Sequence, residues 1–94
     1  MRIIGTAKLD EFARKHARAR KSLATWEKVV RAADWKNSAE MKRTFNSVDY
    51  DDPRTIFDIG GNNLRLVALV DFGKQIVQIS DVMTHAEYDK GRWK

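Results

Sequence analysis

Apolar residues follow two different periods along this chain, and the change between them divides it into a helical half and a strand half. Up to about residue 45 they recur every three or four positions, which is typical of helices that bury one face. From residue 54 onward the apolar positions follow a period of two, which predicts strands. With 94 residues the chain is too short for two cores, so we expect one domain over residues 1–94.

A short strand and an amphipathic helix are predicted at the start. The segment Arg2–Gly5 is mostly apolar and ends at a glycine. Thr6 follows, in position to cap a helix over about Ala7–His16. Its apolar residues Leu9, Phe12 and Ala13 share one face, which we expect to be buried.

Two more helices are predicted before the pattern changes. Ser22 is expected to cap the second helix, which runs to about Ala33. Asn37 and Glu40 have the spacing of a capping box and start a short third helix that ends near Phe45. The polar segment 46–53, with three aspartates and the proline, predicts a loop.

A three-stranded meander is predicted in the second half. Its strands are Arg54–Ile59, Leu64–Phe72 and Gln75–Met83. Residues 60–63, Gly-Gly-Asn-Asn, predict the first hairpin turn, and Gly73-Lys74 the second. Thr84 and Glu87 form a capping box that starts a short terminal helix.

The longest predicted strand assigns the two faces of the sheet. Alternate residues on one side are all apolar, namely Leu64, Leu66, Ala68, Val70 and Phe72. This side should carry the helices, because successive side chains of a strand point to opposite faces. Arg65 lies on the other side and is expected on an open face. The predicted fold is α+β: a small antiparallel sheet with an added N-terminal strand, helices packed on one face and a short C-terminal helix.

The positive charge is concentrated in the first half. Residues 1–47 hold 12 of the 18 Lys and Arg and 5 of the 13 Asp and Glu, within a net charge of +5. Such a one-sided field attracts polyanions, with nucleic acid the leading candidate, although solvated helix faces would give the same pattern.

Composition excludes several classes of chemistry. The absence of cysteine excludes disulfides, a cysteine-ligated zinc site and a thiol nucleophile. No apolar run is long enough to span a membrane, and the start of the chain does not have the form of a signal peptide. We therefore expect a soluble, cytoplasmic protein with no membrane partner.

Three residues are candidates for catalysis. His85 follows the capping Thr84, and Tyr88 lies three residues later on the same helical face, so the two side chains could act together in proton transfer. The alternative is that both pack the helix against the sheet. Arg65 could place its guanidinium against a phosphate, or could pair across the strands with a carboxylate such as Asp58.

Other candidate residues have simpler explanations. His16 sits among cations at a helix end, where an exposed role is expected. The aspartates of segment 46–53 lack the spacing of an EF-hand. Trp35 and Trp93 could stack on a base or close the edge of the core, and we favour the edge.

Three ordered segments resemble the HigB branch of the toxin–antitoxin ribonucleases, within the RelE-like superfamily. They are Ala33-Asp34-Trp35-Lys36-Asn37, Gly61-Asn62-Asn63-Leu64-Arg65-Leu66-Val67 and Met83-Thr84-His85-Ala86-Glu87-Tyr88-Asp89. The similarity covers nearly the whole chain, and the order of elements is that of the RelE-like fold. The Gly-Asn-x-x-Arg and Thr-His-x-Glu-Tyr-Asp segments are its most specific parts.

The resemblance implies a function and a set of partners. Toxins of this kind enter the ribosomal A site and cleave mRNA without a metal or other cofactor. A helix-turn-helix antitoxin of the HigA kind neutralises them, and operator DNA is bound only through that antitoxin. The resemblance places the superfamily's strand arginine at Arg65, its terminal tyrosine at Tyr88 and the HigB histidine at His85.

The chain departs from RelE itself at two places. RelE carries a basic pair on the strand before the hairpin, where this chain has only Arg54. RelE also has an arginine before the terminal helix, where this chain has Val82-Met83. His85 therefore becomes the better candidate for proton transfer, as the base, with Arg65 stabilising the phosphorane and Tyr88 orienting the 2′-hydroxyl or His85, or stacking on a base.

Basic residues of the helical half are expected to bind ribosomal RNA rather than the scissile strand. They are Lys8, Arg14, Lys15, Arg18, Arg20, Lys28, Arg31 and Lys36. Two other functions fit the same sequence. One is a non-catalytic RNA- or ribosome-binding module, and the other is a protein-interaction domain whose sheet edge accepts a partner strand.

Overall fold

A computed structural model describes residues 1–60, 63–91 and 93, and within them the chain forms a five-stranded sheet. The strands lie in the order β1-β5-β4-β3-β2, with β1 parallel to β5 and the other neighbours antiparallel. Their bounds are β1 Arg2–Ile4, β2 Asp49–Asp51, β3 Arg54–Ile59, β4 Leu64–Asp71 and β5 Ile76–Thr84.

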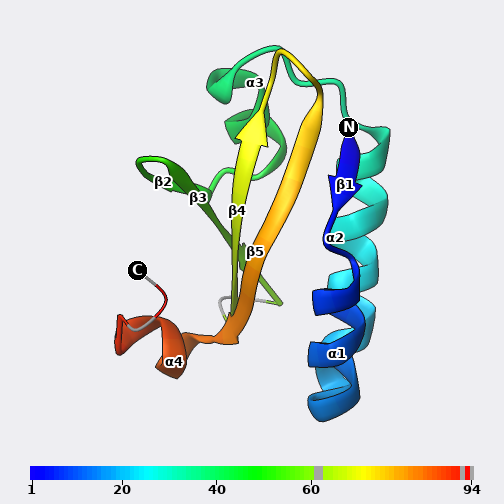
Figure 1. The fold of residues 1–94 in the computed structure, drawn as a ribbon, viewed down its shortest axis with the longest axis vertical. Helices are drawn as coiled ribbons and strands as arrows, with labels where there is room; N and C mark the ends of the chain where they lie inside the picture. Colours follow the sequence, from blue (N-terminus) through cyan, green and yellow to red (C-terminus); the bar gives the residue numbers. More distant parts are fainter. Residues whose placement is uncertain (61–62, 92, 94) are drawn as a thin grey trace.

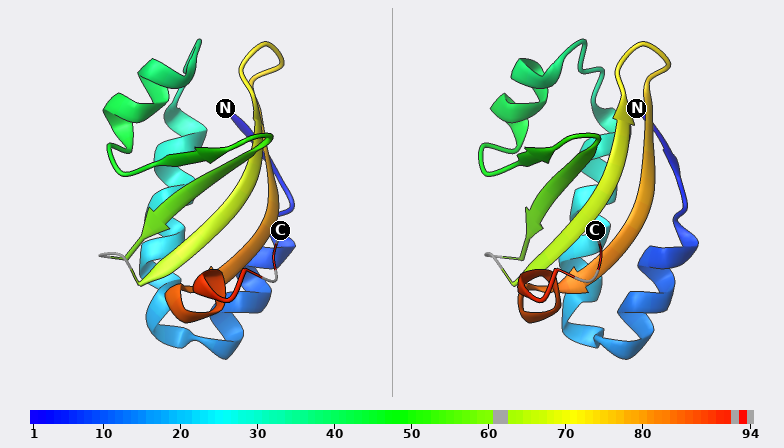
Figure 2. Two further views of the ribbon diagram at one scale, coloured as in Figure 1. Left: turned by 90° about the vertical axis from the view of Figure 1, so that its left-hand side faces the viewer. Right: turned by 60° about the vertical axis from the view of Figure 1, so that its left-hand side comes forward.

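Helices lie on both sides of this sheet, and the two longest share one side (Figure 1). They are α1 Ala7–Lys15, the 3₁₀ turn Ala17–Ala19, α2 Arg20–Ala32, α3 Ser38–Thr44 and α4 His85–Asp89. Helices α1 and α2 lie side by side against one face, while α4 and the C-terminal end lie on the other side (Figure 1). The views in Figure 2 show α4 in front of the sheet and the long helices behind it. The α+β class, the added N-terminal strand and the short terminal helix are confirmed.

The main core lies between the sheet and helices α1 and α2. Leu66 and Val77 from the central strands are fully buried there, as are Phe57 from β3 and Val30 from α2. The apolar face predicted for β4 is the one that packs on the helices. Trp35 is buried in this core and donates its indole N–H to Thr44 Oγ1 at 3.0 Å, so it packs within the protein as the favoured alternative required.

Two of the predicted helix caps are wrong. Thr6 already has helical dihedral angles and makes no side-chain cap hydrogen bond. Ser22 lies inside α2, which begins at Arg20 directly after the 3₁₀ turn. That turn supplies backbone carbonyls to the N–H groups at the junction, with Ala19 N donating to His16 O at 2.9 Å. A hydroxyl cap is therefore not needed.

The predicted loop 46–53 contains a strand. Residues Asp49–Asp51 form β2 and pair with β3 at the edge of the sheet. All three side chains are exposed. An edge strand of this kind needs backbone pairing but no apolar side chains, so the period-two signal is absent from its sequence.

A β-bulge between β4 and β5 exchanges the two faces of β5. Val67 is paired with Asp81, but the next residue, Ala68, is paired with Ile79, so Ser80 is the extra residue. Before the bulge Val77 and Ile79 face the helices. After it Val82 packs on the helix side, whereas Met83 joins a second cluster on the far face.

The half of the far face that carries Arg65 is covered, whereas the sequence predicted an open face. Ile56, Val67 and Met83 are buried there, and Tyr88 and Trp93 pack against them. This second cluster lies beneath α4 and the C-terminal end. It covers the half of the face that carries Arg65, while the other half remains open at Leu69.

The short helix α4 is fixed at its start by the predicted capping box. Thr84 Oγ1 accepts from Glu87 N at 3.2 Å, and Glu87 Oε1 accepts from Thr84 N at 3.0 Å. At α3, Asn37 accepts from Glu40 N, but Glu40 accepts from Lys36 N instead of Asn37 N, so only half of the box predicted there forms. The hairpin before β4 includes residues 61 and 62, which lie outside the described residues.

We expect Thr84→Ala to lower the free energy of unfolding by about 1 kcal/mol, because it removes a cap that orders α4. Ser22→Ala is the matched control and should change stability by less than about 0.5 kcal/mol, since Ser22 is not a cap. Urea unfolding followed by circular dichroism measures both. An equal decrease in the free energy of unfolding of the two variants would contradict this assignment of the caps.

Candidate functional site

Arg65 is held inside the covered half of the far face. It lies on β4 directly opposite Asp58 of β3, and its Nε is 3.0 Å from Asp58 Oδ1. Its Nη1 donates to the Leu64 carbonyl at 3.1 Å, and the side chain is only 9% exposed. The cross-strand pair with Asp58, one of the two alternatives for Arg65, is therefore present. A buried guanidinium requires such a partner because an unpaired charge there would be costly.

Tyr88 of α4 covers this guanidinium. The Cζ atom of Arg65 lies 5.4 Å from the centre of the Tyr88 ring, which is the geometry of a cation–π contact. Burial raises the pKa of Tyr88, nearby carboxylates act in the same direction, and the charge of Arg65 opposes them. The raised pKa favours the protonated phenol, which can donate a hydrogen bond.

His85 begins α4 and is directed to a different partner. Its backbone N–H donates to the Asn63 carbonyl at 3.0 Å, which ties the helix to the hairpin before β4. Its ring Nδ1 lies 3.0 Å from Asp89 Oδ2, one helical turn later. Asp89 was not among the sequence candidates, although its spacing of four residues from His85 is the signal that could have identified it.

Trp93 completes the cover of the far face. Its ring stacks on Tyr88 with centres 4.9 Å apart and planes inclined by 12°. Its indole N–H donates to the Tyr88 carbonyl at 2.9 Å, and the Arg54 Cζ lies 5.8 Å from its ring centre. Trp93 thus closes the edge of the second cluster, and Arg54 joins the candidate site although sequence reasoning had not selected it.

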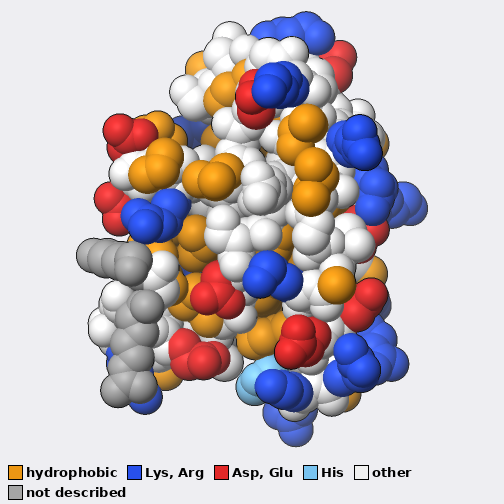
Figure 3. All heavy atoms as spheres, in the orientation of Figure 1, with side chains coloured by type: hydrophobic (Ala, Val, Ile, Leu, Met, Phe, Trp, Pro, Cys, Tyr) orange, Lys and Arg blue, Asp and Glu red, His pale blue; other side chains and the backbone are white. Residues whose placement is uncertain are grey.

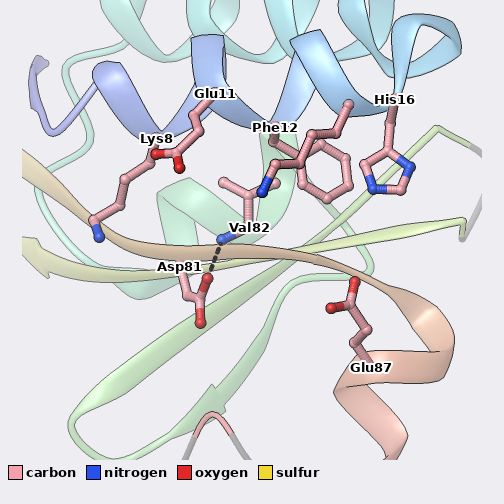
Figure 4. Close-up of a pocket in the computed structure, with 8 residues that line it drawn as sticks. Lys8, Glu11, Phe12, His16, Asp81, Val82 and Glu87 are labelled. Atoms are coloured by element: carbon pink, nitrogen blue, oxygen red, sulfur yellow. Dashed lines mark hydrogen bonds between the residues drawn. The ribbon is translucent and has the colours of Figure 1, made fainter.

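A second polar cleft lies between α1 and α4, and it contains His16. Lys8, Glu11 and Phe12 of α1, and His16 directly after it, face Asp81 and Val82 of β5, with Glu87 of α4 opposite (Figure 4). His16 is exposed, as expected, and its ring stacks on Phe12 with centres 4.3 Å apart. The Thr84 backbone N–H holds the pKa of the Glu87 carboxyl below its ordinary value, and the nearby His16 and Lys90 act in the same direction.

The cations selected from the sequence are all exposed. Lys8, Arg14 and Lys15 lie on α1, Arg18 on the 3₁₀ turn, Arg20, Lys28 and Arg31 on α2, and Lys36 before α3. Lys and Arg side chains gather along the side of the molecule formed by α1 and α2 (Figure 3). Arg31 is engaged by Glu27 at 3.0 Å, so its charge is partly neutralised.

The described residues contain neither a metal site nor a membrane-spanning helix. Within residues 1–60, 63–91 and 93, no three or more His, Asp or Glu side chains are grouped so that they could hold a metal ion. Among the same residues, no helix is both long and apolar enough to cross a membrane.

The mixed five-stranded sheet, with its N-terminal strand and short terminal helix, is consistent with the RelE-like fold. A family model described as the HigB toxin, a RelE-like toxic component of a toxin–antitoxin system, matches residues 19–91. The chain belongs to this HigB toxin family. It is 33% identical over 93 residues to the mRNA interferase HigB of Escherichia coli O6:H1, covering 96% of this chain and 90% of that protein.

A second relative gives the same result. The mRNA interferase toxin HigB of Escherichia coli K12 is 35% identical over 92 residues, covering 95% of this chain and 88% of that protein. Both alignments extend over nearly the whole of each chain.

We expect Asp58→Ala to destabilise the protein by about 2 kcal/mol, because it leaves the Arg65 guanidinium buried without its carboxylate. This value is below the range for fully buried pairs, since the Asp58 side chain is 24% exposed. The exposed Asp34→Ala is the control, and guanidinium unfolding measures both. A loss no larger than that of the control would show that Asp58 is not needed to bury Arg65.

Proposed function

We propose that this protein is the toxin of a toxin–antitoxin pair and that it cuts mRNA as an endoribonuclease. The observation that carries the proposal is the position of Arg65, on the strand after the hairpin and under the Tyr88 ring, in a chain of the HigB toxin family. Both relatives named above are mRNA interferases, and the similarity to this chain extends over nearly the full length of each.

The proposed reaction uses the RNA's own 2′-hydroxyl. The 2′ oxygen loses its proton to a base and attacks the adjacent phosphorus, the bond to the 5′ oxygen breaks, and that oxygen receives a proton. The products are a 2′,3′-cyclic phosphate and a 5′-hydroxyl end. No metal enters this scheme, so protein side chains supply the proton transfers and the positive charge.

His85 is proposed as the base. Its Nδ1 faces the Asp89 carboxylate at 3.0 Å, which favours the tautomer with the proton on Nδ1 and leaves Nε2 as the acceptor. A carboxylate that orients an imidazole in this way also stabilises the imidazolium formed during the reaction. Asp89 is therefore a positioning residue for His85.

Arg65 and Tyr88 are proposed to act on the phosphate and its neighbours. The guanidinium of Arg65 is suited to the charge that develops on the phosphorane oxygens. It is buried in the present arrangement, so a phosphate must displace part of its cover to reach it. The raised pKa of Tyr88 suits it to orient the 2′-hydroxyl or a leaving oxygen as a hydrogen-bond donor.

The proposed setting is the translating ribosome in the cytoplasm. The exposed cations of α1, α2 and the 3₁₀ turn would bind ribosomal RNA while the far face meets the mRNA. A helix-turn-helix antitoxin of the HigA kind would neutralise the toxin, and operator DNA would be bound only through it. Family membership supports an antitoxin partner.

One observation favours a second candidate function, a non-catalytic RNA- or ribosome-binding module. Arg65 already pairs with Asp58, and His85 already pairs with Asp89, so both candidate groups have structural partners. In that case the exposed cations of the helical half would bind RNA, and the protein would not cleave it. Measurement of cleavage separates the two possibilities.

We expect His85→Ala to slow mRNA cleavage at least 100-fold, and Arg65→Ala by a similar factor, because each removes a group that acts in the transition state. Mapping of cellular mRNA 5′ ends after induction, together with growth arrest, measures the effect. His16→Ala is the matched control and should cleave like the wild type, because its ring stacks on Phe12 away from Arg65. Unchanged cleavage in both site variants would refute the proposed site, and absence of cleavage by the wild type would favour the binding module.

We expect Arg18→Gln to weaken ribosome binding and to reduce its salt dependence, because one fewer phosphate contact releases about one fewer counterion. Sedimentation with ribosomes at several salt concentrations measures the slope. Lys74→Gln, an exposed cation in the turn between β4 and β5, is the control and should keep the wild-type slope. Loss of growth arrest by Arg18→Gln with unchanged ribosome binding would contradict the division of roles.

A further inference from the structure

Four side chains on the far face of the sheet follow one another in a continuous series of contacts. Arg65 lies against the Tyr88 ring, Tyr88 stacks on Trp93, and Arg54 lies over the Trp93 ring. The successive separations are 5.4 Å, 4.9 Å and 5.8 Å. A flat aromatic ring between a tyrosine and a guanidinium is the arrangement by which proteins hold an unpaired nucleobase.

The Tyr88–Trp93 contact differs from the aromatic contacts of the main core. Those between Trp26 and Phe57 and between Phe45 and Phe57 are edge-to-face, with planes inclined by 73° and 80°. Tyr88 and Trp93 are inclined by only 12°, which is the parallel geometry of base stacking. Both rings are half-buried rather than enclosed.

Trp93 is attached to this position by local contacts. Its indole N–H donates to the carbonyl of Tyr88, five residues earlier in the chain. It packs against the small cluster of Ile56, Val67 and Met83 on the far face. The indole can therefore leave its place without opening the core that holds the fold together.

We propose that Trp93 occupies the place of a nucleobase, and that a base of the bound mRNA stacks on Tyr88 in exchange for it, with Arg54 covering the base's other face. This inference rests on the proposed function, since it names the base-binding residues of the same site. It assigns Arg54 and Trp93 roles in substrate binding that neither the sequence pattern nor the comparisons assign.

The exchange also explains how a phosphate reaches Arg65. The guanidinium is covered by Tyr88, and Tyr88 is covered in turn by Trp93. When Trp93 leaves, the Tyr88 ring loses the partner that holds it down and can shift with the incoming base. Base binding and access to Arg65 are thereby coupled, so a nucleotide that cannot stack would not reach the catalytic charge.

The exchange predicts that Trp93 competes with RNA. RNA can stack on Tyr88 only in molecules from which Trp93 has left. The apparent affinity for RNA is therefore the intrinsic affinity multiplied by the fraction of such molecules. One aromatic stack corresponds to about a 3-fold to 10-fold change in an equilibrium constant. Trp93→Ala should therefore bind RNA about 3-fold to 10-fold more tightly than the wild type, although it removes an aromatic side chain from the site.

The experiment measures binding without cleavage. The probe is a single-stranded RNA nonamer with 2′-O-methyl groups at every position, which blocks attack by the 2′-hydroxyl. Fluorescence anisotropy gives the affinity of the wild type, Trp93→Ala and Trp93→Phe. We expect tighter binding by Trp93→Ala and near wild-type binding by Trp93→Phe, because phenylalanine retains a ring that can stack on Tyr88.

Two further measurements make the test specific. Acrylamide quenching should increase when the probe binds the wild type, because Trp26 and Trp35 are only 2% and 4% exposed and the signal reports Trp93. Arg54→Gln, made in the Trp93→Ala background, should weaken probe binding about 3-fold by removing the guanidinium over the base. Thermal unfolding confirms that each variant is folded.

The results separate this inference from the proposed function. Weaker binding by Trp93→Ala would show that the indole is itself the platform and would overturn the exchange. Unchanged quenching on binding, or no probe binding by either protein, would overturn it as well. If the wild type still cleaves mRNA on ribosomes in those cases, the nuclease function stands and only the base exchange fails.

Discussion

The β-bulge between β4 and β5 is the constraint on which the functional half of the structure depends. By inserting Ser80, it sends Val82 to the helix side and Met83 to the far face. Met83 can then pack with Ile56 and Val67, which gives the sheet a second, small apolar patch. Without the extra residue Met83 would point into the main core, and α4 would have no apolar surface to cover. The bulge therefore creates the place where Tyr88 and Trp93 pack, immediately before the helix that carries His85.

Burial of Arg65 follows from that second patch. Once α4 lies over the sheet, the arginine on β4 is enclosed, and the opposite residue on β3 has to be a carboxylate to balance it. Asp58 meets this need at 3.0 Å. The same low-dielectric surroundings that make the pair costly also strengthen any interaction of Arg65 with a phosphate that replaces its cover. A buried, paired arginine is thus compatible with a structural role and with catalysis.

Much of this architecture was predictable from the sequence, and the failures have identifiable physical causes. The strands, the capping box at Thr84 and the amphipathic faces of α1 and α2 follow from periodicity and local hydrogen bonding, which a sequence displays directly. Strand β2 was missed because an exposed edge strand needs only its backbone. The bulge was missed because one extra residue changes the register without altering composition. As a result, Arg65 was expected on an open surface. The Arg54 contact with Trp93 was not anticipated because it depends on tertiary structure, whereas the pairing of Asp89 with His85 is local and its four-residue spacing was overlooked.

The covered site bears on how such a nuclease can be restrained. The Arg65 guanidinium is paired with Asp58 and lies beneath the Tyr88 ring, so this cover separates it from RNA in solution. Under the proposed function, activity requires a substrate whose binding energy opens the cover, and an mRNA strand held on a ribosome would supply it more readily than free RNA because its position is already constrained. The positive helices lie on the opposite side of the sheet from α4, so they can hold a large polyanion without occupying the site. The proposed function therefore places attraction to RNA and cleavage of RNA on the two sides of one small sheet.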